Sequence, residues 1–130
     1  MAIEIQLLAG AVILGIVHIL LGAQLSTMQR GAKWNVGNRD GNTPELKGVA
    51  ARADRALNNF KESFPLFVGA VLAVVAANKL GGRSELGAHL YLWARVAYLP
   101  VYLIGIPVVR SLIWLVSIAG IILVLSGLFG

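Results

Sequence analysis

Long apolar stretches alternate with short polar segments along this chain. Four of them approach the length of a membrane span, and they are Ile5–Leu25, Phe64–Ala77, Leu86–Ile106 and Leu112–Phe129. A spanning helix needs roughly 20 mostly apolar residues, and the second stretch reaches that length only if the polar residues before it continue the same helix. We therefore expect an all-α fold, an integral membrane four-helix bundle formed by one domain over residues 1–130, with helices over 3–29, 46–79, 84–105 and 108–129.

Turn-forming residues mark the three connections between these stretches. The first is long, reads RGAKWNVGNRDGNTPEL, and is rich in Gly, Asn, Asp and Pro, which favour turns. In the second, NKLGGRSE, the glycines can end one helix and Ser84 can cap the next. In the third, Pro107 lacks a backbone donor and favours a break.

Composition and charge agree with a membrane protein. Hydrophobic residues make up 58% of the chain and charged residues 13%, compared with about a quarter charged in soluble domains. The net charge is +5, and the basic residues gather in the first connection and at the start of the second helix. By the positive-inside rule, the first and third connections face the cytoplasm and both termini the opposite side. A soluble basic face is lacking, so we expect no nucleic-acid partner.

The amino-terminal apolar stretch is expected to be a retained helix rather than a cleaved signal peptide. It is long, is preceded by Glu4 instead of a basic region, and ends without a clean small-residue cleavage site. The chain has no cysteine, which excludes disulfides and a protein thiolate nucleophile. Any thiol chemistry would have to use a thiol carried by a ligand.

The segment RADRALNNFKESFP has one polar face when it is helical. At about 100° per residue, one narrow sector holds Arg52, Arg55, Asn59 and Glu62. One interpretation is a salt-bridge network between Arg55 and Glu62 that holds helices together. The other is a ligand site, in which guanidinium groups bind carboxylates and Glu62 receives an ammonium group. We favour the ligand site, because one carboxylate beside two arginines on this face leaves positive charge unmatched.

A second polar stripe lies on the third helix. The residues YLWARVAYLPVY place four polar side chains in one narrow sector, namely Tyr91, Arg95, Tyr98 and Tyr102. An interfacial belt accounts for any single tyrosine, but four aligned positions that include a deep arginine favour a ligand-facing or inter-helix role.

Three further polar residues have alternative interpretations. Arg110, followed by Ser111, opens the last helix, where a lone arginine is usually a snorkelling anchor. Beside a thiol it would instead lower the pKa of that thiol and favour the thiolate. His18 lies midway along the first helix, where a hydrogen-bonded packing role is favoured over proton transfer.

Taken together, these segments resemble the membrane-associated proteins in eicosanoid and glutathione metabolism, the MAPEG family. RALNNFKESFPLF is similar to the family's second-helix pattern at Arg55, Ala56, Asn59, Glu62 and Pro65. YLWARVAYLPVY in the third helix and RS at the start of the fourth strengthen the resemblance, and the order of apolar stretches extends it over nearly the whole chain.

The resemblance implies a trimer of four-helix membrane subunits that binds glutathione between neighbours. We therefore expect a prokaryotic-type homotrimer, surrounded by lipid in a bacterial inner membrane, with glutathione as co-substrate and a small lipophilic electrophile as substrate. Transferase or peroxidase activity would depend on Arg110, which stabilises the thiolate, with Ser111 beside it. The residues implied to bind glutathione or line its pocket are Arg30, Arg52, Arg55, Asn59, Glu62, Tyr91, Arg95, Tyr98 and Tyr102.

Two other functions stay open at this point. The segment from Tyr102 to Arg110 differs in length from that of eicosanoid synthases, which leaves room for a non-catalytic scaffold or ligand-binding protein with the same fold. A small transporter would require an ionisable group midway through the first helix, and His18 is the residue that offers one.

Overall fold

The computed structural model describes residues 1–41 and 43–130, and the described chain is helical throughout its regular structure. The elements in chain order are α1 (Ile3–Arg30), α2 (Ala32–Val36), α3 (Gly48–Ala76), α4 (Gly82–Ile104), α5 (Pro107–Ser126) and the 3-10 turn η1 (Gly127–Phe129). The all-α fold class is therefore confirmed.

The second long helix is shorter than the predicted range of 46–79. α3 begins at Gly48, which has a positive φ of 60°, and it ends at Ala76, shortly before Asn78 turns into the left-handed region with φ 58°. The short α2 lies within the first connection, where only turns were expected; it has five residues and no buried side chain. The glycine-rich composition of this connection favours turns, so the sequence did not indicate a helix there.

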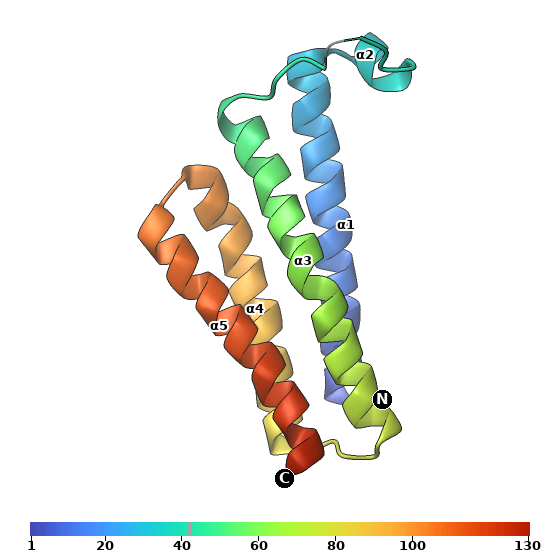
Figure 1. Ribbon diagram of the computed structural model, residues 1–130, viewed down its shortest axis with the longest axis vertical. Helices are drawn as coiled ribbons and strands as arrows, with labels where there is room; N and C mark the ends of the chain where they lie inside the picture. Colours follow the sequence, from blue (N-terminus) through green and yellow to red (C-terminus); the bar gives the residue numbers. More distant parts are fainter. Residues whose placement is uncertain (42) are drawn as a thin grey trace.

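The four long helices lie as two neighbouring pairs along the long axis of the molecule (Figure 1). α1 packs beside α3, and α4 packs beside α5. α2 and its connection lie at one end, and both chain termini lie at the other (Figure 1). This arrangement puts the predicted cytoplasmic connection and the two termini at opposite ends of the molecule.

An apolar core joins the two pairs in the half of the molecule near the termini. Phe67 of α3 stacks on Tyr91 of α4 with ring centroids 4.1 Å apart, and neither side chain is exposed. Val71, Val74 and Val124 are fully buried around them. Close contacts between these branched and aromatic side chains gain dispersion energy in lipid as they do in water.

α4 and α5 cross at two glycines. A Cβ added at Gly87 would lie 2.5 Å from the carbonyl oxygen of Gly120, and one added at Gly120 would lie 2.6 Å from that of Gly87. Only residues without a Cβ permit this approach of two backbones. Gly69 on α3 has no such close neighbour, because an added Cβ there would meet no atom of the described residues within 4 Å.

Within residues 1–41 and 43–130, three helices are long and apolar enough to cross a membrane, namely α1, α3 and the segment from Pro107 to Phe129. Large apolar side chains such as Ile13, Leu20 and Ile122 are more than half exposed, as lipid-facing residues would be. α4 is not among the three, because its tyrosines, His89 and Arg95 dilute its apolar residues. A fourth span, and with it the four-helix membrane bundle, stays a prediction.

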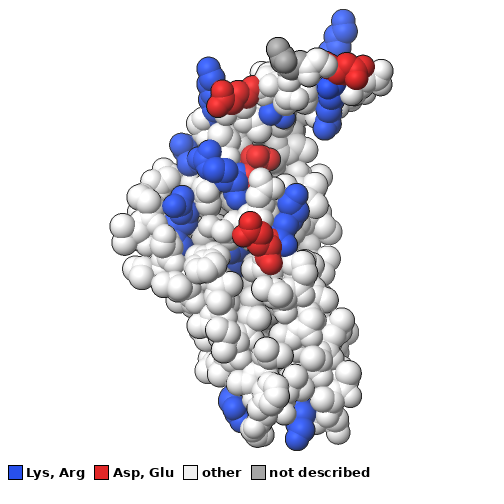
Figure 2. Space-filling model, in the orientation of Figure 1, with Lys and Arg blue, Asp and Glu red and all other residues white. Residues whose placement is uncertain are grey.

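Charged side chains divide the surface into zones. On the face in Figure 2 they gather over the half that carries α2, whereas the other half is uncharged until basic groups reappear at its far end. Lys79 and Arg83 lie in that far region, at the connection between α3 and α4. An uncharged zone between two charged ends is the surface expected of a protein embedded in a bilayer.

Candidate functional site

A polar cavity of about 210 Å³ opens where α3, α4 and α5 meet in the charged half of the molecule. Its lining comes from all three helices and consists of Asn59, Tyr98, Tyr102, Arg110, Ser111 and Trp114. Five of these residues were singled out from the sequence on separate segments. The structure brings them together.

The turn between α4 and α5 sets the position of Arg110. Gly105 ends α4 in the left-handed region with φ 89°, which its missing side chain permits, and donates its N–H to the carbonyl of Val101. Pro107 then begins α5, where its fixed φ suits the first helical position. Arg110 follows in the first turn, and its guanidinium lies 4.7 Å from the ring centroid of Tyr102. The unusual length of this segment therefore does not remove Arg110 from the cavity.

Ser111 lies at the rim of the cavity, but its own helix engages its hydroxyl. The Oγ donates to the carbonyl of Pro107 over 3.2 Å, and the residue is exposed. Such a bond to the preceding turn is common for serine in helices. Ser111 is therefore a weaker candidate than Arg110 for a direct role in catalysis.

Arg95 lies behind the cavity rather than in its lining. Its side chain is 0% exposed, and one guanidinium N–H donates to Oδ1 of Asn59 over 2.9 Å. The guanidinium also lies 4.2 Å from the ring centroid of Tyr98, which is within range of a cation–π interaction. Its Nε and second terminal nitrogen have no hydrogen-bond partner among the described residues.

The polar face expected on α3 is divided in the structure. Arg52 is half-buried and donates from Nε to the carbonyl of Leu103 on α4 over 2.8 Å, so it ties the two helices together. Arg55 and Glu62 are exposed and lie outside the cavity lining. No ion pair joins these two residues, both of which the structure describes, so the salt-bridge alternative is not supported within one chain.

Tyr91 and Arg30 have structural contacts away from the cavity. The hydroxyl of Tyr91 is 2.9 Å from that of Ser63 in the core, so the start of the α4 stripe packs on α3 while its end lines the cavity. Arg30 donates from Nε to the carbonyl of Pro44 over 2.7 Å and lies 4.9 Å from the ring centroid of Trp34. It therefore holds the first connection.

The sequence did not point to Trp114, and the hydrogen bond expected for His18 is wrong, although its packing role is observed. Trp114 follows Arg110 by four residues and so shares its helix face, which was the available signal. His18 is 1% exposed and stacks on Phe60 at 4.9 Å, but neither ring nitrogen has a partner among the described residues. A packing histidine was expected, but its expected hydrogen bond is not found.

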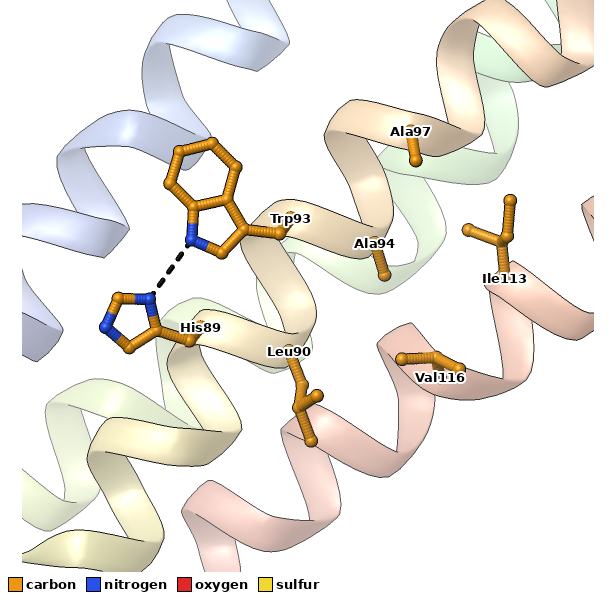
Figure 3. A pocket seen from close by; sticks show the side chains of 7 residues that line it. All are labelled: His89, Leu90, Trp93, Ala94, Ala97, Ile113 and Val116. Atoms are coloured by element: carbon orange, nitrogen blue, oxygen red, sulfur yellow. Dashed lines mark hydrogen bonds between the residues drawn. The ribbon is translucent and has the colours of Figure 1, made fainter.

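A second concave surface lies between α4 and α5 and is almost wholly apolar. Figure 3 shows Ala94 and Ala97 of α4 facing Ile113 and Val116 of α5 across this groove of about 300 Å³. At one end, the indole N–H of Trp93 donates to Nδ1 of His89 over 3.1 Å. The groove offers volume for hydrocarbon but few groups for chemistry, so the polar cavity is the better candidate site.

Comparison with known proteins identifies the fold family. The model of the MAPEG family matches residues 7–130, which is nearly the whole chain, and the match includes every residue that lines the polar cavity. No curated protein and no solved structure shows a significant match. The family match agrees with the resemblance drawn from the second, third and fourth helices, and the chain belongs to the MAPEG family.

Proposed function

We propose that this protein is a membrane-bound, glutathione-dependent transferase or peroxidase that acts on small lipophilic electrophiles. The observation that carries the proposal is the position of Arg110, which stacks on Tyr102 in a cavity also lined by Asn59. A cation, an amide and two phenols suit a ligand that bears carboxylates, peptide groups and a thiol.

Arg110 would activate the thiol of the ligand. A guanidinium next to a thiol favours the thiolate, which is the nucleophilic form. The chain has no cysteine of its own, so the thiol would come with glutathione. The bilayer would deliver an apolar electrophile to the same depth, and the exposed apolar side chains of α1 and α5 are consistent with direct contact with lipid.

A neighbouring subunit would complete the site. The cavity of about 210 Å³ is below the roughly 300–1,000 Å³ typical of small-molecule pockets. Arg55 and Glu62, which the resemblance assigns to glutathione, are exposed and have no hydrogen-bond or ion-pair partner among the described residues. We propose that a homotrimer brings another chain over these groups, with the α2 end in the cytoplasm of a bacterial cell and both termini across the inner membrane.

A binding protein without catalysis is the second candidate. It is favoured by the engaged hydroxyl of Ser111, which leaves Arg110 without a free hydroxyl at the adjacent position. Such a protein would bind glutathione in the same cavity but would not speed the reaction of any electrophile.

The test is glutathione conjugation and hydroperoxide reduction by detergent-solubilised wild type, Arg110→Ala and the control Lys79→Ala, which lies at the far end of the molecule. We expect Arg110→Ala to lower turnover by roughly 100- to 1,000-fold, because one preorganised stabilising group is lost. Lys79→Ala should match wild type. Equal turnover in all three would remove Arg110 from the mechanism, and binding of glutathione without turnover in wild type would establish the second candidate.

A further inference from the structure

Arg95 is a fully buried cation that meets no carboxylate in the described chain. Its guanidinium lies near two rings, 4.2 Å from the centroid of Tyr98 and 5.6 Å from that of Phe60. Its hydrogen bond to Asn59 crosses from α4 to α3 and joins residues 36 positions apart. Burying a charge costs free energy unless the charge is hydrogen-bonded or paired. Breaking the bond to Asn59 would therefore be costly, and the bond restricts the orientation of the Asn59 side chain.

The chemistry of arginine fixes how the Asn59 amide is oriented. Arginine has only donors, so the Asn59 atom that receives its N–H must be the carbonyl oxygen. With that oxygen held toward Arg95, the remaining polar group of the side chain is its NH₂. Asn59 also lines the polar cavity, and its NH₂ makes no hydrogen bond to another described residue.

We propose that Arg95 is a positioning residue that holds the Asn59 amide with its oxygen toward the core and its NH₂ toward the cavity. The cavity then presents a fixed donor to a carbonyl or carboxylate oxygen of the ligand. This role differs from ligand contact, because Arg95 is 0% exposed and does not line the cavity. That the ligand is glutathione rests on the proposed function; the orientation of the amide does not.

A double-mutant cycle tests the inference, with glutathione as the probe and calorimetric titration of purified protein as the assay. Arg95→Met removes the donor at similar volume and should weaken binding roughly tenfold, as loss of one oriented hydrogen bond does. In an Asn59→Ala background the same change should weaken binding less than about twofold, because no amide is left to orient. Equal losses in both backgrounds would overturn the proposal.

Ser63→Ala is the matched structural control. It removes a buried hydrogen bond to Tyr91 without touching Asn59, and its effect should be the same in both backgrounds. Where Arg95→Met fails to fold, Asn59→Asp decides. It keeps an acceptor for Arg95 but removes the donor, so the protein should fold and lose at least tenfold in affinity. Binding equal to wild type would refute the donor role.

A measurement without ligand separates this inference from the proposed function. In protein labelled with ¹⁵N-asparagine, Asn59→Ala identifies the side-chain NH₂ signal of Asn59. Arg95→Met should shift that signal more than Ser63→Ala does, whereas equal shifts would overturn the inference. If wild type binds no glutathione, the proposed function fails, and this signal still decides whether Arg95 positions Asn59.

Discussion

Gly87→Ala should destabilise the protein, because the α4–α5 crossing has no room for a methyl group. The new Cβ would lie 2.5 Å from the carbonyl oxygen of Gly120 and 2.7 Å from the backbone nitrogen of Val124. The first distance falls short of an ordinary 3.4 Å contact by about 0.9 Å. Both obstacles are backbone atoms, which no side-chain rotation can remove, so the two helices must move apart.

The size of the effect follows from that separation. A gap of about 0.5–1 Å forfeits a quarter to a half of the dispersion energy of each contact along the crossing. Overpacked sites in proteins lose about 1–3 kcal/mol for this reason. The control is Gly22→Ala on α1, where an added Cβ meets nothing within 4 Å. It should be neutral or stabilising by up to about 1 kcal/mol, since alanine is the better helix former.

Reversible unfolding in mixed micelles of a mild detergent and dodecyl sulfate, followed by circular dichroism and tryptophan fluorescence, measures both free energies. We expect Gly87→Ala to unfold at lower dodecyl sulfate than wild type and Gly22→Ala at the same level or higher. If Gly87→Ala were as stable as Gly22→Ala, the close approach at Gly120 would be wrong, and with it the packing of α5 on α4.

Three other outcomes are expected. Tyr91→Phe should cost about 1 kcal/mol of unfolding free energy, because the buried hydrogen bond between Tyr91 and Ser63 is lost, and should leave glutathione affinity unchanged in titration. Trp114→Ala should weaken glutathione binding, whereas Trp93→Ala, on the apolar groove, should not; equal effects would show that tryptophan loss acts through stability. Arg30→Ala should speed limited proteolysis within residues 31–41, because the connection loses its hydrogen bond to the end of α1.

Periodicity predicted the polar stripes of α3 and α4 but not which part of each meets the other. Asn59 and Arg95 were placed on separate faces of separate helices, and their contact depends on how α3 and α4 cross. Tyr91 and Tyr98 share one stripe, yet the first lies in the core and the second lines the cavity. The helical period shows which way a side chain points around its own helix axis. It does not show which part of a neighbouring helix lies at the same level along that axis.

Local chemistry explains what could be predicted well. Pro107 marked the break that starts α5, because the backbone preference of proline acts within a few residues. The pairing of Gly87 with Gly120 could not be predicted in this way, because the two glycines lie on different helices and meet only where those helices cross.

The tight turn at Gly105 also has a consequence for the order of assembly. α4 and α5 are joined by two residues, so their contacts, including that between Tyr102 and Arg110, close a short loop at small entropic cost. Asn59 must reach Arg95 across 36 positions. We expect Tyr102 and Arg110 to come together when this helical hairpin forms, and Asn59 to join them later. In pulse-labelled hydrogen exchange, α4 and α5 should therefore be protected before α3. The half of the cavity that holds Arg110 would then be the part that folds first.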